Sequence, residues 1–327
     1  MTRKFSNFTF LMACTLAGAL LAWTIATGFQ STAQAQGQPQ VQQAQAAQAQ
    51  PQAAQAPKAQ APKGAAAFPG GRGGPAPAPK KHVLVIGMTR GYHHGSTSDG
   101  LAMFWNLGKE SGAYDTEIKT DMEWVTKRQP GSEAHSLPFF DAVIFVNCTG
   151  DWGLNDEQKE ALLSFVRDDG KGLVLAHASI DANYNWPEFG EMAGGWFNAH
   201  PWNTFDAPVI VEDRDFPAMR HFPKYLRLYD EMYSAKAFSR DKVNVLMRLD
   251  ESKLDYSNPQ VAKRAREDKD EAIAWAKMYG KGRVFYSSLG HTKEAWDDPV
   301  VRTMYLEGIK WAMGRTEGST ASHPKVQ

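Results

Sequence analysis

The sequence predicts an α/β fold in which a mainly parallel sheet is covered by helices on both faces. Three short apolar runs, "HVLVIG", "DAVIFVN" and "GLVLAH", each break into a polar loop. Apolar side chains recur at helical spacing over 101–107 after the first run, and Asn155 with Gln158 predicts a capped helix after the second. The third run leads to "WPEFGEMAGG", which predicts a short helix and a turn. Apolar strands that alternate with amphipathic helices are typical of a doubly wound sheet.

The second half of the chain is richer in strands. "APVIVED", "KYLRLYDEMYSA" and "NVLMRLD" are candidate strands, and "EAIAWAKMYGKGRVFYSSLGH" predicts two strands joined by a turn at 279–282. Asp298 and Pro299 predict the start of a final helix. The charged stretch 250–271 is typical of a solvated surface loop.

The first 35 residues have the pattern of a secretory signal peptide. Arg3 and Lys4 precede an apolar run from Phe8 to Ala26, and Ala33-Gln34-Ala35 has the small residues of a cleavage site. We therefore expect a periplasmic or secreted protein with no membrane span. The alternative is that the apolar run is retained as a membrane anchor.

Composition divides the remaining chain and limits its chemistry. Residues 36–80, rich in Gln, Ala and Pro, predict a disordered linker, followed by one domain over 81–315 and a disordered tail over 316–327. The chain has 36 basic and 36 acidic residues, so its net charge does not indicate a nucleic-acid partner. No glycine-rich phosphate-binding motif follows the first strand, so no nucleotide cofactor is expected.

Polar side chains follow each of the three apolar runs. Ligands of doubly wound folds bind beyond the carboxyl ends of the strands, where these side chains would gather. The residues are Tyr92, His93 and His94 after the first run, Asn147 and Asp151 after the second, and His177 and Asp181 after the third.

Further candidates come from the second half of the chain. His291 follows the last strand, and His200 lies in "GGWFNAHPW", where two glycines allow a close backbone approach. Glu231 in "YDEMY" could orient a histidine or act as a base. Tyr233 and Trp202 suit either packing or contact with a sugar ring. We expect structural roles for His82, His135, His221 and His323.

Histidine stands where many α/β enzymes carry a nucleophile. His177 directly follows a strand, whereas Ser179 lacks the G-x-S-x-G surroundings of a serine nucleophile. Cys148 follows the second run but has no adjacent base, so a small buried thiol is expected. Without the signal segment Cys148 is the only cysteine, which leaves histidines and carboxylates as metal ligands.

The segments "GYHHGS", "LVLAHASID", "GGWFNAHPW", "YDEMY" and "WDDPVVRTMYLEGIKWA" resemble the trehalose-utilisation (ThuA-like) family over nearly all of 82–314. The resemblance implies a flavodoxin-like fold of the class I glutamine-amidotransferase type. It also implies that His177 replaces the cysteine nucleophile, so that amidotransfer is lost. One departure is "DRDFP", where family members often have a His-Pro dipeptide; Asp215–Pro217 is therefore not counted as a ligand.

The resemblance implies a small-molecule carbohydrate as partner, in particular keto-sugars or glycosides. Histidine acid/base chemistry, with or without a divalent metal such as zinc, would support an isomerase or a lyase. The alternative is a non-catalytic carbohydrate-binding module. The expected catalytic residues are His177, His200, Glu231 and His291. The expected substrate-binding residues are Tyr92, His93, His94, Asn147, Asp151, Asp181, Trp202 and Tyr233. The metal candidates are His93, His200 and His291.

Overall fold

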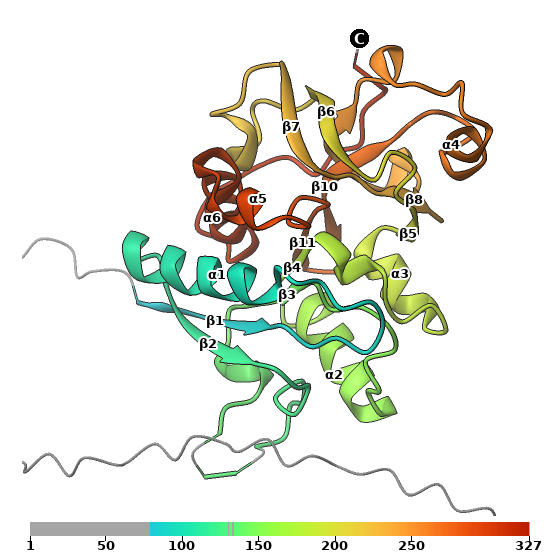
Figure 1. Ribbon diagram of the computed structural model, residues 1–327. Coiled ribbons are helices and arrows are strands. Elements are labelled where there is room, and N and C mark those ends of the chain that lie inside the picture. Colours follow the sequence, from blue (N-terminus) through green and yellow to red (C-terminus); the bar gives the residue numbers. More distant parts are fainter. Residues whose placement is uncertain (1–78, 130, 133, 327) are drawn as a thin grey trace, which may run out of the picture. The chain divides into compact units, whose positions relative to one another are not determined.

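The computed structural model describes residues 79–326 with the exception of 130 and 133, and they build an α/β fold around one nine-stranded sheet (Figure 1). The order of its strands is β2-β1-β3-β4-β11-β10-β9-β6-β7, and β5 and β8 pair separately. The strands are β1 Lys81–Ile86, β2 Tyr114–Lys119, β3 Ala142–Val146, β4 Gly172–Ala176, β5 Trp196–Ala199, β6 Thr204–Val211, β7 Tyr225–Glu231, β8 Ser234–Lys236, β9 Asn244–Leu249, β10 Ala272–Tyr279 and β11 Gly282–Ser287.

The sheet has a parallel part and an antiparallel part. Strands β2, β1, β3, β4 and β11 pair in parallel, and β4 is buried throughout, as the continuous apolar runs predict. From β11 onward through β10, β9, β6 and β7 all pairings are antiparallel. The predicted α/β fold is confirmed, and the strand-rich second half forms the antiparallel part.

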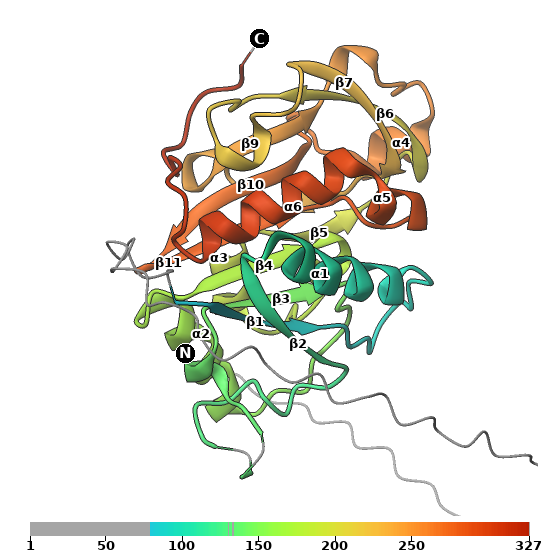
Figure 2. The ribbon, with the colours of Figure 1, turned by 90° about the vertical axis from the view of Figure 1, so that its left-hand side faces the viewer.

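Helices cover both faces of the sheet, as predicted. Helices α1 (Thr97–Ser111), α5 (Lys293–Asp297) and α6 (Pro299–Ala312) bury their apolar sides in one core, where they lie side by side (Figure 2). Helices α2 (Asp156–Arg167) and α3 (Pro187–Ala193) pack into the core on the opposite face. The two cores fix the sheet from both sides and hold the loops that leave its strands.

Local sequence determines several helix ends. Asn155 and Gln158 form the predicted capping box of α2, and the Asp298 side chain accepts a hydrogen bond from the amide of Val300 at the start of α6. Helix α3 is followed by Gly194, whose φ of 92° is easily reached by glycine alone. Each of these boundaries follows from residue types visible in the sequence.

Several elements were not predicted, among them β2, β5 and α4. Strand β2 has the polar sequence YDTEIK because it is an edge strand, and only one of its residues is buried. Strand β5 lies within the loop that carries His200. Helix α4 (Pro259–Arg264) lies in the charged stretch that we expected to be a loop, and it begins with the Asn258 cap followed by proline.

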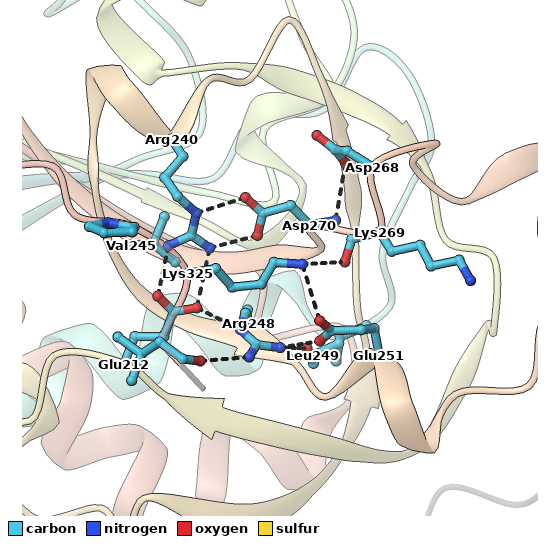
Figure 3. A network of polar contacts seen from close by, with 12 residues as sticks. Glu212, Arg240, Val245, Arg248, Leu249, Glu251, Asp268, Lys269, Asp270 and Lys325 are labelled. Carbon is cyan, nitrogen blue, oxygen red and sulfur yellow. Dashed lines mark hydrogen bonds and ion pairs between the residues drawn. The ribbon is translucent and has the colours of Figure 1, made fainter.

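The C-terminal tail differs from its expected disorder. The Asn244 side chain donates to the carbonyl of Ser319 at 2.8 Å, and His323 Nε2 lies 3.0 Å from the carbonyl of Val245. The tail also joins a buried ionic network in which Glu212 binds Arg240 and Arg248 (Figure 3). Polar tail residues are thus ordered by partners on β9 that a composition argument cannot foresee.

The expected signal peptide, and the expected linker up to residue 78, lie outside the described residues. Within the described part of the chain, every helix is too short or too polar to cross a bilayer.

Candidate functional site

A cavity of about 370 Å³ opens where the loops after β1, β4 and β11 meet the end of β7. The carboxyl ends of parallel strands therefore border it, as the fold class predicts. Its volume lies within the range of small-molecule sites. Its lining consists of Tyr92, His94, Asp181, Phe197, His200, Glu231, Tyr233 and His291.

Three histidines and a carboxylate converge at the floor of this cavity. One ligand-type atom from each of His94, His177, Glu231 and His291 lies within 4.8 Å of all the others. Nε2 of His177 is 3.8 Å from Oε2 of Glu231, and Nδ1 of His291 is 3.2 Å from the same oxygen. Residues that are up to 197 positions apart in the sequence thus form one cluster, as their strand-end positions predict.

His177 is held in a fixed orientation beneath the cavity. Its backbone adopts the left-handed conformation (φ 48°) directly after β4, which is rare for a residue with a side chain. Nδ1 donates to the carbonyl of Ser288 at 2.6 Å, so the lone pair on Nε2 points toward Glu231 and the Tyr233 hydroxyl. Burial lowers the pKa of His177 well below its ordinary value, which keeps the ring neutral.

The burial of His177 corrects one expectation. Its exposed fraction is 0%, and it does not belong to the cavity lining. A general base must come within hydrogen-bond reach of the substrate proton. His177 is therefore placed to position or bind other groups rather than to take that proton itself.

The structure selects His94 rather than His93. His94 is buried in the cluster, whereas His93 is exposed. Burial lowers the pKa of His94 to about 4, and its Nδ1 has no hydrogen-bond partner among the described residues. Ser96 ties this loop to the loop after β11, because its hydroxyl contacts the carbonyl oxygens of Gly290 and His291 at 3.1 and 2.7 Å.

Asp230 positions the loop that carries His291. Its buried carboxylate accepts backbone hydrogen bonds from Gly290, His291 and Thr292 at 2.6 to 3.3 Å. Burial raises the pKa of Asp230 to about 6, and the contact with Glu231 raises the pKa of His291. Asp230 was missed in the sequence, because its role depends on a loop that lies 60 residues farther along the chain.

His200 is the histidine that the cavity exposes most. A third of its side chain is accessible, and Nδ1 lies 3.4 Å from Oε1 of Glu231 and 3.1 Å from Oδ1 of Asn203. Glu231 therefore contacts His177, His200 and His291 at once. Phe197, which was also missed, packs between the rings of His200 and Tyr233.

The other predicted substrate-binding residues separate into two groups. Tyr92 and Asp181 line the cavity, and the Tyr184 hydroxyl donates to Asp181 at 2.6 Å. Burial raises the pKa of Asp181.

Asn147, Asp151 and Trp202 lie elsewhere. Asn147 is fully buried behind the Ser96 loop, and Asp151 borders a separate hollow next to Lys159. The indole of Trp202 donates to the carbonyl of Asp255 and packs on neighbouring aromatic rings. Their positions in the sequence place these residues near the predicted edge of the sheet but do not determine where their side chains point.

The four remaining histidines have local partners outside the cluster. His82 packs on Phe139, and His135 lies 3.3 Å from Glu117. His221 contacts the carbonyl of Val300, and His323 belongs to the ordered tail.

Comparisons with known proteins agree with this fold. A family model described as ThuA, trehalose utilisation, matches residues 82–312. No curated protein matches the chain significantly.

Two solved structures, both described as ThuA-like proteins, resemble the chain. The protein from Parabacteroides merdae ATCC 43184 has a TM-score of 0.57 and 18% identity, with 75% of this chain and 98% of that chain covered. The protein from Bacteroides uniformis ATCC 8492 has a TM-score of 0.57 and 19% identity, with 73% and 95% covered. These similarities show the fold, and the family match over most of the described domain shows that the chain belongs to the ThuA family.

Proposed function

We propose that the chain is a carbohydrate-active enzyme that removes the proton next to the carbonyl group of a keto-sugar or keto-glycoside. The observation that supports it best is the pairing of His200 with the buried carboxylate of Glu231 at the mouth of the histidine cluster. An accessible imidazole oriented by a carboxylate is a common general base. A keto group acidifies the neighbouring C–H bond, which brings this step within the reach of a histidine.

His200 takes the proton in this proposal. Glu231 and Asn203 both face Nδ1, so either can accept its N–H and leave the lone pair on Nε2. When Nε2 accepts the proton, the electrons of the C–H bond form a C=C bond and the carbonyl oxygen gains the negative charge. The oxygen then meets the floor of the cavity, where His94 and His291 lie.

Two outcomes follow from the same enediolate. If the His200 imidazolium returns the proton to the former carbonyl carbon and the adjacent hydroxyl passes its own proton to the negatively charged oxygen, the keto group moves and the reaction is an isomerisation. If a glycosidic oxygen leaves from the next carbon with its bonding electrons and takes the proton from His200, the reaction is an elimination. Tyr92, Phe197 and Tyr233 supply aromatic walls on which a sugar ring can pack.

Turnover of keto-glycosides by the purified protein tests the proposal. We expect turnover of keto-glycosides but not of the corresponding alcohols, and His200→Ala should lower kcat/KM by about 10²- to 10⁴-fold. His221→Ala is a matched control, because His221 is an exposed histidine that does not belong to the cavity lining. Both variants should unfold at the temperature of the parent protein.

Two results would contradict the proposed enzymatic function. Equal turnover by His200→Ala and His221→Ala would show that His200 is not the base. Binding of sugars without turnover of any keto-glycoside would favour the alternative, a non-catalytic carbohydrate-binding module.

The proposal includes export to the periplasm or the medium. It is supported by Arg3 and Lys4 ahead of the apolar run and by Ala33-Gln34-Ala35 after it. N-terminal sequencing of the protein from its native host should then give Gln36 as the first residue. An intact N-terminus in the membrane fraction would show the anchored alternative instead.

A further inference from the structure

We propose that the cavity floor binds one divalent transition-metal ion of the zinc type. Its ligands are one ring nitrogen each of His94, His177 and His291 and one carboxylate oxygen of Glu231. This set differs from the sequence-based metal candidates. His93 is exposed, and His200 is not one of the four residues whose ligand-type atoms lie within 4.8 Å of one another.

The spacing of the four atoms is close to that of the ligands around a zinc ion. Ligands at about 2.0–2.1 Å from a tetrahedral zinc ion lie about 3.4 Å from one another. Here Glu231 Oε2 lies 3.2 Å from His291 Nδ1 and 3.8 Å from His177 Nε2, and all four atoms fall within 4.8 Å. Small side-chain rotations close the remaining gap.

Hydrogen bonds leave several of these lone pairs unused. Nδ1 of His94 and Nδ1 of His291 are buried, and neither makes a hydrogen bond of good geometry among the described residues; the Nδ1 atom of His291 has only its contact with Glu231 Oε2 at 3.2 Å. Leaving a buried polar atom without a partner costs about 1–3 kcal/mol, so native proteins rarely tolerate it without a reason. A cation at the centre of the cluster would satisfy both nitrogens.

The surroundings have the form of a second coordination shell. A metal-binding histidine usually donates its other N–H to a carbonyl or a carboxylate, which fixes the ring. Nδ1 of His177 donates to the carbonyl of Ser288 at 2.6 Å, so Nε2, which the Tyr233 hydroxyl contacts at 3.2 Å, carries the lone pair that would bind an ion. Asp230 fixes the backbone of His291 through three amides of its loop.

A purely hydrogen-bonded cluster explains these contacts less well. The Tyr233 hydroxyl lies 3.2 Å from Nε2 of His177 and supplies one donor. Nδ1 of His94 is still left without a hydrogen-bond partner among the described residues, and Nδ1 of His291 is left with only its contact to Glu231. Imidazole and carboxylate together suit zinc and its first-row neighbours, and the absence of cysteine from the four ligands excludes a thiolate site.

The inference deepens the proposed function and shares its cavity. A zinc ion can expand from four to five ligands, and the fifth position would face the cavity that His94, Glu231 and His291 line. A substrate keto oxygen bound there would be polarised, which stabilises the enediolate. Metal binding itself is measured without any substrate, so it can hold even if the proposed reaction does not.

The experiment loads the chelator-treated full chain with Zn²⁺ or Co²⁺ and measures bound metal after desalting. We expect about one ion per chain, and Co²⁺ should give the visible absorption of a four- or five-coordinate site. His94→Ala, Glu231→Gln and His291→Ala should each weaken binding by at least about 100-fold, since even second-shell changes cost about 10- to 100-fold. His221→Ala should bind like the parent protein.

Tyr233→Phe separates a metal site from a hydrogen-bonded cluster. This substitution removes the hydroxyl that contacts Nε2 of His177, so the metal affinity of the variant should equal or exceed that of the parent protein. A parent protein that retains no metal, or metal retained equally by all the ligand variants, would overturn the site. Metal binding without turnover of keto-glycosides would overturn the proposed function alone, and full turnover by the metal-free protein would overturn the metal's role.

Discussion

Among single residues, Cys148 shows how burial decides whether a reactive group can react. It lies two positions after β3, near the edge where nucleophiles of α/β enzymes often lie. Its exposed fraction is 0%, its thiol contacts the carbonyl of Ile86 at 3.2 Å, and burial raises its pKa to about 12. A thiol in this state is neither accessible nor ionised at neutral pH.

Cys148→Ala should therefore leave catalysis intact. The change removes one buried sulfur from the core beneath β1 and β3, so we expect a loss of about 1–2 kcal/mol in the free energy of unfolding. Turnover of a keto-glycoside and denaturant unfolding measure the two effects. A variant that folds normally but loses turnover would mean that the reacting group has been misassigned.

The histidines show what residue type can and cannot predict. Their positions after apolar strands were enough to predict that His94, His177 and His291 gather in one place. The choice between His93 and His94 was not predictable, because adjacent loop residues point in different directions. The full burial of His177 was not predicted either, because an apolar strand pattern reveals neither the exposure of the residue that follows it nor the left-handed backbone that His177 adopts.

Among the secondary-structure elements, Asp141 links three strands at the edge opposite the site. Its carboxylate accepts hydrogen bonds from Lys81 at 2.9 Å and Lys171 at 3.3 Å, and from the amide of His82 at 3.0 Å. These contacts connect the starts of β1, β3 and β4. Burial alone would raise the pKa of Asp141, but the hydrogen bonds outweigh it and hold the pKa below its ordinary value.

Asp141→Asn should lower stability in a way that depends on pH. We expect a loss of about 1–2 kcal/mol in the free energy of unfolding at pH 7. A depressed pKa stabilises the folded state above the unfolded value of about 3.9, and this contribution is lost as pH falls through the folded value.

Denaturant unfolding from pH 7 to pH 3 should thus show the two proteins converging in the acid range. Asp115→Asn is the control, since its pair with Lys80 is exposed and should contribute little. A difference that stayed constant down to pH 3 would contradict the assignment.

For the whole molecule, patterning predicted the layers but not all of their parts. Continuous apolar runs identified β1, β3 and β4, and the turn at 279–282 identified the β10–β11 hairpin. Edge strand β2 and the ordered tail were not predicted, because their order comes from neighbours distant in sequence rather than from their own composition. The same reason limits site prediction: long-range packing, not the local motif, decides which polar residues enter the cavity.

The central claim is that His200 removes a proton from carbon next to a keto group, and hydrogen exchange tests it most directly. A keto-glycoside incubated with the protein in D₂O and followed by NMR should incorporate deuterium at that carbon in the recovered substrate, because His200 exchanges its proton with solvent and returns deuterium to the same carbon before isomerisation or elimination is complete. The His200→Ala protein should lose this exchange by about 10²- to 10⁴-fold, while His221→Ala keeps it. Exchange no faster than in buffer, or equally fast in both variants, would contradict the account.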